Sequence, residues 1–186
     1  MTTDRVSFHQ YSMAQQPGFT LVELIAVIII VGILGAIASS RFFGGASFDS
    51  VAYANQTSAL LRYAQKLAVA QNRNVHVRLN GTGIALCYDP SCPPAGQVLA
   101  PGGANSASAA TLSACAGSST WACEAPPAQV RVAPTVSFYF DPLGKPFAAA
   151  DVSPTPVSTF NTLPVTITAG SLVRTITVEM ETGYVH

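Results

Sequence analysis

Charge is scarce in this sequence. Nine of its 186 residues are Lys or Arg and nine are Asp or Glu, so charged residues make up 10% and the formal net charge is zero. Ordinary soluble domains carry about 25% charged residues, so the composition indicates a membrane-linked or secreted chain and argues against a cytosolic enzyme. Hydrophobic residues make up 49%, which excludes a disordered chain, because disorder requires high charge and few apolar groups. Without an overall basic excess, binding to nucleic acid has to be local.

Histidine is scarce as well, and the motifs of common enzyme classes are missing. The sequence contains three histidines, His9, His76 and His186, so a Ser-His-Asp or Cys-His arrangement would have to use His76 or the chain end. No Walker-type, dinucleotide-binding or zincin motif is present. Asp141 and Asp151 fit turn and loop positions better than an acid/base pair. The sequence therefore predicts a structural subunit that needs no cofactor.

One long segment lacks charge altogether. Between Glu23 and Arg41 lie 17 uncharged residues, which include LIAVIIIVGILGAIA from Leu24 to Ala38. As a helix this run spans roughly 26 Å, at the short end for crossing a bilayer core of about 30 Å. A carboxylate at the centre of a membrane helix costs about 2.5–3.5 kcal/mol, and less near the interface. Glu23 is therefore expected to have a partner.

Two other interpretations of this run stay open. In a secretory signal peptide, a small-residue cleavage site would follow the run, and Ala36-Ile37-Ala38 imitates one. The run begins late for a signal peptide, however, and Arg5 before it is offset by Asp4. A plain signal anchor would account for the hydrophobicity but not for Glu23.

The residues before the run carry a family resemblance. The string GFTLVE from Gly18 to Glu23, followed by the apolar run, resembles the prepilin signature of type IV pilins and type II secretion pseudopilins. The resemblance implies that a prepilin peptidase cuts between Gly18 and Phe19 and N-methylates Phe19. It also implies that Glu23 of an incoming subunit neutralises the Phe19 amine of its neighbour inside an apolar filament core. Because an unpaired charge there is costly, the pair would set the register of assembly.

A flexible break at Gly44-Gly45 separates two predicted helices, because glycine weakens a helix. Beyond it, Asp49 to Asn72 has the pattern of an amphipathic helix with Ser47 or Asp49 as N-cap. The apolar stripe expected to pack on a sheet consists of Tyr53, Leu60, Ala64, Leu67 and Ala68. The predicted regions are the leader 1–18, the transmembrane and assembly helix 19–43, the amphipathic helix 44–72 and the periplasmic β domain 73–186.

Alternating apolar residues predict strands in the rest of the chain. Gly81-Thr82-Gly83 is expected to join the first two strands, and Ala169-Gly170-Ser171 the last two, as β-hairpins. The expected strands are 74–80, 84–88, 130–132, 136–140, 165–168 and 172–181. The expected fold class is α+β, in which the second half of a long N-terminal helix packs on an antiparallel sheet or small sandwich.

A segment rich in Pro, Gly, Ala and Ser, residues 89–128, is long for a loop and needs a constraint. Cys87, Cys92, Cys115 and Cys123 supply it, since an even number of cysteines indicates disulfides in an oxidising periplasm. Of three connectivities, Cys87 with Cys92 and Cys115 with Cys123 is favoured because both close short loops, while a longer clamp from Cys87 to Cys123 stays open. The spacings do not fit a zinc site, so no metal is expected.

Three further segments resemble GspH/FimT-like minor pilins, including the minor prepilins of mannose-sensitive haemagglutinin (MSHA) pili. They are residues 58–68, FDPLGKP at 140–146 and TGYV at 182–185. This resemblance implies a minor pilin that primes or caps a surface pilus used for adhesion, or a type II secretion pseudopilin. Its partners would be the prepilin peptidase, inner-membrane lipid before assembly, and other pilin subunits through the N-terminal helix.

Two further hypotheses stay open. Some relatives bind DNA, and a basic face made by Arg62, Lys66, Arg73 and Arg78 would contact phosphates, although few aromatic residues accompany it. The other is an anchored periplasmic domain outside any filament. The expected location is the bacterial inner membrane, as a single-pass protein with a periplasmic C-terminal domain, and then a pilus or pseudopilus.

Overall fold

The computed structural model describes the backbone of residues 20–42, 45–152 and 157–186, and the side chains of residues 20–35, 48–152 and 157–186. The chain forms two compact units, residues 1–43 and 44–186. Gly18, Phe19 and Gly44 lie outside the described residues. The predicted cleavage site and half of the predicted glycine break therefore lie outside them too.

The described part of the first unit is a helix, α1, from Leu21 to Phe42. Thr20 precedes it, and its Oγ1 accepts a hydrogen bond from the backbone N–H of Glu23 at 3.2 Å. This is the geometry of an N-cap side chain. Within the described residues, no helix is both long enough and apolar enough to cross a membrane.

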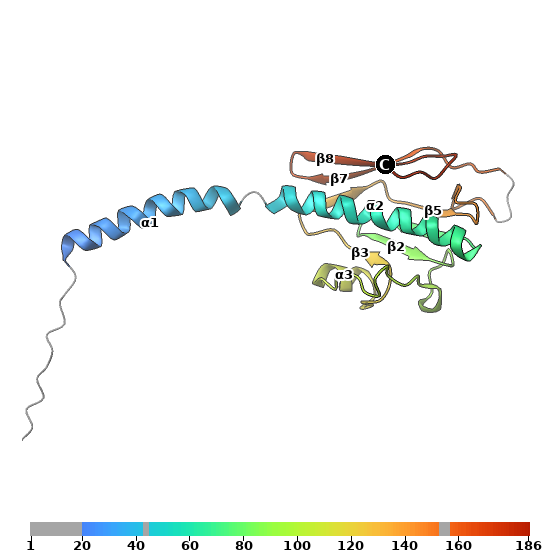
Figure 1. Ribbon diagram of the computed structural model, residues 1–186, viewed down its shortest axis with the longest axis horizontal. Helices are drawn as coiled ribbons and strands as arrows, with labels where there is room; N and C mark the ends of the chain where they lie inside the picture. The colour runs from blue at the N-terminus through green and yellow to red at the C-terminus, as the bar shows by residue number, and fades with distance from the viewer. Residues whose placement is uncertain (1–19, 43–44, 153–156) are drawn as a thin grey trace, which may run out of the picture. The chain divides into compact units, whose positions relative to one another are not determined.

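The second unit combines a long helix with two antiparallel sheets (Figure 1). Helix α2 runs from Gly45 to Gln71. The five-stranded sheet has the order β3-β2-β1-β5-β6, and the three-stranded sheet has the order β4-β7-β8. The strands are β1 Val75–Leu79, β2 Ile84–Cys87, β3 Cys123–Glu124, β4 Val130–Ala133, β5 Val136–Phe140, β6 Pro146–Ala148, β7 Leu163–Ala169 and β8 Leu172–Val178. The predicted α+β fold class is confirmed.

The core lies between α2 and both sheets, and Figure 1 shows α2 lying along them. Four of the five residues of the predicted apolar stripe are buried, while Leu67 is half-buried. Leu61, which the stripe omits, is fully buried. The strands add alternate residues such as Val75 and Val77, which are 0% exposed. Alternation in a strand therefore puts its other residues on the face away from α2.

Both predicted hairpins are present. β1 and β2 pair from Leu79 opposite Ile84, and β7 and β8 pair from Ala169 opposite Leu172. Gly170 between the latter has φ +59°, in the left-handed region that a residue without a Cβ adopts most easily.

Several details differ from the sequence-based expectation. α2 begins at Gly45, so neither Ser47 nor Asp49 is its N-cap; no proline lies between Phe42 and Asp49 to stop the helix from extending back. Strand β6, which the alternation does not predict, follows the turn residues after Phe140 and pairs with β5.

The long segment 89–128 also contains regular structure. A 3₁₀ turn occupies Pro94–Gly96 and a short helix, α3, occupies Ala109–Ala114. Ser108 caps α3 by accepting a hydrogen bond from Thr111 N–H at 3.1 Å. The segment ends in β3, whose pairing with β2 ties it to the five-stranded sheet.

Two motifs distant in the sequence meet at α2. Gln65 Nε2 donates to the Gly144 carbonyl oxygen at 3.0 Å and to the Thr182 carbonyl oxygen at 2.7 Å. Gly183 has φ +65°, and a Cβ on it would overlap the Gly144 carbonyl oxygen. The FDPLGKP turn, the TGYV segment and α2 are therefore packed into one junction.

Candidate functional site

Glu23 lies at the N-terminus of α1. Of the three predicted processing and assembly residues, Gly18, Phe19 and Glu23, it is the one that the structure describes. Besides the bond from Glu23 N–H to Thr20 Oγ1, the Thr20 carbonyl oxygen accepts from Leu24 N–H at 3.2 Å. Glu23 thus occupies the first turn, where the positive end of the helix dipole favours a carboxylate. Thr20 was not predicted as a site residue. The T-x-x-E spacing, typical of a capping box, is the signal that would have found it.

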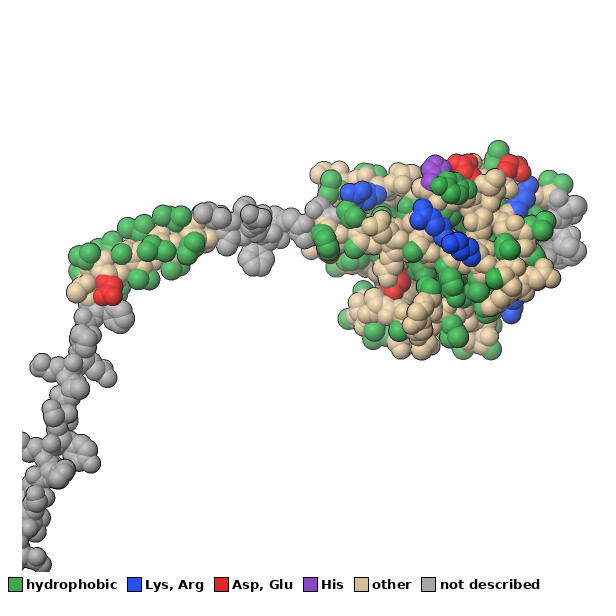
Figure 2. All heavy atoms as spheres, viewed as in Figure 1, with side chains coloured by type: hydrophobic (Ala, Val, Ile, Leu, Met, Phe, Trp, Pro, Cys, Tyr) green, Lys and Arg blue, Asp and Glu red, His purple; other side chains and the backbone are tan. Residues whose placement is uncertain are grey.

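Apart from Glu23, the described side chains of α1, residues 21–35, are apolar and exposed all round the helix. Five consecutive residues, Val27 to Val31, are 52% to 61% exposed, and consecutive helical residues point to different sides. Figure 2 shows this surface in green, with a single acidic side chain in red. A helix that is hydrophobic all round is normally buried in a larger core or in a membrane. The described residues of α1 therefore present a large apolar surface that the helix cannot bury by itself.

The four cysteines form two disulfides, Cys87 with Cys92 and Cys115 with Cys123. Their Cα–Cα distances are 5.4 Å and 5.9 Å, within the usual range. Cys87 and Cys123 are strand residues, whereas Cys92 and Cys115 belong to the connecting segment. Each bond therefore fixes part of the long segment to the five-stranded sheet.

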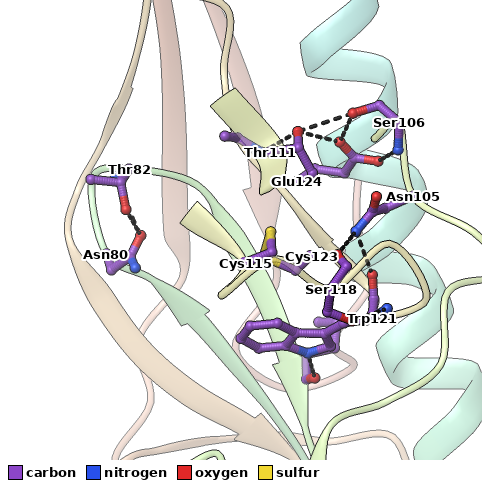
Figure 3. Close-up of a disulfide and its surroundings, with 12 residues drawn as sticks. Asn80, Thr82, Asn105, Ser106, Thr111, Cys115, Ser118, Trp121, Cys123 and Glu124 are labelled. Carbon is purple, nitrogen blue, oxygen red and sulfur yellow. Dashed lines mark hydrogen bonds between the residues drawn. A yellow bond between two sulfur atoms is a disulfide. The ribbon is translucent and has the colours of Figure 1, made fainter. Parts of the chain in front are cut away.

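The buried carboxylate of Glu124 also anchors the segment 89–128, through hydrogen bonds from Ser106 and Thr111 (Figure 3). Glu124 is 4% exposed, and its carboxylate accepts hydrogen bonds from Ser106 N–H and Ser106 Oγ, both at 2.7 Å, and from Thr111 Oγ1 at 3.0 Å. Its backbone oxygen accepts from the Tyr53 hydroxyl at 3.3 Å, and burial raises the pKa of Tyr53. Because every carboxylate partner is a neutral donor, Glu124 is best explained as a structural anchor that hydrogen bonds satisfy. No sequence pattern marked it.

The four cations of the possible nucleic-acid face do not form one surface. Arg62 and Lys66 are four residues apart and lie together on the exposed side of α2. Arg62 Nε donates to the Val185 carbonyl oxygen at 3.1 Å, and Arg73 stacks over the Tyr88 ring at 3.8 Å. Arg78 alternates with the buried residues of β1 and so lies on the face opposite α2.

Few described groups offer catalytic or metal-binding chemistry. His76 is half-buried beside Tyr139, with 5.2 Å between ring centroids, and burial lowers its pKa. Across the part of the chain that the structure describes, no group of three or more His, Cys, Asp or Glu residues is placed to hold a metal ion.

One family model matches the chain. Residues 13–39 match the model described as the prokaryotic N-terminal methylation motif. No curated protein and no solved structure matches this chain. The matched residues include Gly18, Phe19 and Glu23, and the match supports a structural subunit rather than an enzyme. In this segment the chain is similar to prepilins and pseudopilins, the subunits that carry a type IV pilin-like leader.

Proposed function

We propose that this chain is a minor type IV pilin-like subunit that enters, or primes, a pilus used for surface attachment. A prepilin peptidase would remove residues 1–18 and N-methylate Phe19. The observation that carries the proposal is the methylation motif over residues 13–39. It overlaps α1, whose described side chains, residues 21–35, are apolar on all sides of the helix apart from the carboxylate of Glu23.

The exposed apolar surface of α1 supports assembly through this helix. Each large apolar side chain that leaves water contributes about 1.5–3 kcal/mol, so such a surface is strongly driven to be covered. In our proposal, inner-membrane lipid covers it before assembly and the α1 helices of other copies cover it afterwards. Residues 44–186 would lie in the periplasm, an oxidising compartment that suits the two disulfides.

Glu23 supports a specific contact within that assembly. Thr20 caps the helix and places the Glu23 carboxylate in the first turn. After cleavage, the amine of Phe19 would lie four residues away in sequence, and Glu23 of one subunit would pair with the Phe19 amine of the next. In an apolar core, a carboxylate without this partner is costly, so the pair selects one register.

The processing step is tested by mass spectrometry of the mature N-terminus. We expect N-methyl-Phe19 in the natural chain and an intact leader in Gly18→Leu, because a side chain there blocks close approach of the peptidase to the backbone. Gly32→Ala is the matched control, since a Cβ at Gly32 meets no atom within 4 Å. An intact Met1, or a cut near Ala38, in the natural chain contradicts the proposal.

A type II secretion pseudopilin of the GspH kind, or a DNA-uptake minor pilin, would be processed in the same way. Deleting the gene distinguishes these two roles from that of a pilus subunit. Loss of surface attachment with normal exoprotein secretion supports the pilus role. Loss of secretion supports the pseudopilin, and loss of DNA uptake alone supports the third role.

A further inference from the structure

A cavity of about 320 Å³ opens on the face of the five-stranded sheet that α2 does not cover. Its floor includes Arg78 and Ala85, which are opposite each other in the β1–β2 pair. Its walls come from both disulfide-tied segments, since Cys92 lines one side and Trp121 and Cys123 line another. The cavity thus lies between the two disulfides, within the second unit alone.

The walls of this cavity are held in place before any ligand arrives. The two disulfides close short loops, with sequence separations of 5 and 8 residues. Trp121 is 8% exposed, and its Nε1 donates to the Leu86 carbonyl oxygen at 2.7 Å. Small-molecule sites are usually preformed, with volumes of about 300–1,000 Å³, and a rigid wall lowers the entropy lost on binding.

The lining offers positive charge and hydrogen-bond donors. Arg78 is its charged side chain and makes no hydrogen bond or ion pair with any residue that the structure describes. The Asn80 Oδ1 accepts from Thr82 N–H at 3.1 Å and from Thr82 Oγ1 at 2.9 Å, as Figure 3 shows for the side-chain bond. A backbone N–H only donates, so this contact fixes the amide orientation and leaves the Asn80 Nδ2 to donate elsewhere.

The apolar part of the lining complements these donors. The indole nitrogen of Trp121 is already used by Leu86, so Trp121 presents only carbon atoms to the cavity. An arginine pairs best with a planar carboxylate, through parallel N–H···O bonds. We propose that this cavity binds a small carboxylate of the size of a single sugar acid, held by Arg78 and Asn80 and packed against Trp121. The site does not depend on processing or filament assembly.

The test is a fluorescence titration of the full chain in a zwitterionic detergent that carries no sugar. Trp121 is the single tryptophan of the sequence, so its emission reports on this cavity. We expect a saturable change with glucuronate and none with glucose at the same concentrations, because glucose has the same ring without the carboxylate. Arg78→Gln should weaken glucuronate binding by about tenfold or more, the usual loss for a charge-assisted hydrogen bond. Arg131→Gln, at an exposed arginine of the other sheet, should leave it unchanged.

Three results would overturn the proposal: no saturable change with glucuronate, an equal response to glucose, or unchanged affinity in a folded Arg78→Gln chain. Folding of each variant is checked by circular dichroism. If Arg78→Gln does not fold, Gln97→Glu decides the question, since Gln97 is a half-buried lining residue. A carboxylate at that position should repel or displace the ligand, so unchanged affinity there also overturns the proposal.

Discussion

The two units of this chain differ in where their apolar residues find partners. In α1, Val27 to Val31 are each more than half exposed, whereas Val75, Val77 and Leu79 of β1 are 0–1% exposed. The second unit completes its own core from α2 and two sheets, whereas the described part of α1 leaves its large apolar side chains exposed. Assembly and stability are therefore expected to respond to different residues. Changes in α1 should alter association without unfolding residues 44–186, and changes in the second unit should do the reverse.

The largest expected effect is that of Glu23→Ala on assembly. Leaving the Phe19 amine of a neighbour unpaired in an apolar core costs about 3–5 kcal/mol, which reduces incorporation by more than about a hundredfold. The amount of subunit in sheared filaments, measured by immunoblot, reports this loss. Membrane insertion and the thermal unfolding of the second unit should not change.

Glu181→Ala is the control for that prediction. It also removes a carboxylate, but one that is exposed and paired with Lys145 at 2.7 Å in the second unit. Such surface pairs contribute about 0–1 kcal/mol. We expect normal incorporation of Glu181→Ala. Normal incorporation of Glu23→Ala as well would refute the role proposed for Glu23.

Next in size is the loss of a disulfide in the second unit. The double variant Cys115→Ser with Cys123→Ser opens a loop with a sequence separation of 8 residues, which should lower the free energy of unfolding by about 2–3 kcal/mol in the chain-entropy model. Urea unfolding followed by far-UV circular dichroism measures it, and reduction of the natural chain, which opens both disulfides, should cause a larger loss. A second unit as stable as before would show that the bond does not constrain the unfolded chain.

A smaller effect is expected at the junction between α2 and the C-terminal segment. Gly183→Ala should lower the free energy of unfolding by about 2 kcal/mol, because φ is +65° and the new Cβ meets the Gly144 carbonyl oxygen. Gly170→Ala is the matched control, since φ is +59° but no atom lies within 4 Å of its Cβ. Gly170→Ala should lower the free energy of unfolding by about 1 kcal/mol. Equal losses of unfolding free energy in the two variants would show that packing at Gly183 is unimportant.

The sequence predicts the regular parts of this fold better than its exceptions. Period-2 alternation identifies β1, in which one face is buried along the whole strand, and the end of β8, where Ile176 and Val178 are buried. It misses β6, Pro146–Ala148, which is short and follows turn residues. It also misses β3, a two-residue strand defined by the pairing of Cys123 and Glu124 with Ala85 and Ile84 of β2. Such elements depend on contacts between distant segments, which no local pattern encodes.

The candidate functional residues also divide into those that a local sequence pattern predicts and those that only the structure reveals. The leader motif predicts roles for Gly18, Phe19 and Glu23 from local sequence alone; the methylation-motif match covers all three positions, and their roles stay predictions. Burial of Glu124 was not predictable, because an acidic residue is normally exposed and its donors, Ser106 and Thr111, lie 18 and 13 residues earlier in the chain. The cavity around Arg78 also needed the structure, since its lining combines a hairpin with two disulfide-tied segments.

The smallest expected effect is a pH dependence confined to the second unit. Asp151 accepts hydrogen bonds from Thr159 N–H at 2.9 Å, Thr159 Oγ1 at 2.7 Å and Ala148 N–H at 3.0 Å. The bonds from Thr159 hold the pKa of Asp151 below its ordinary value of 3.8. Because the folded pKa lies below the unfolded one, this stabilisation is present above pH 3.8 and is lost as the pH falls through the folded pKa. Asp151→Asn should therefore melt at a lower temperature than the natural chain at neutral pH, with the difference shrinking in more acidic buffer. A difference that stays constant down to strongly acidic pH would mean that Asp151 acts through its shape rather than its charge.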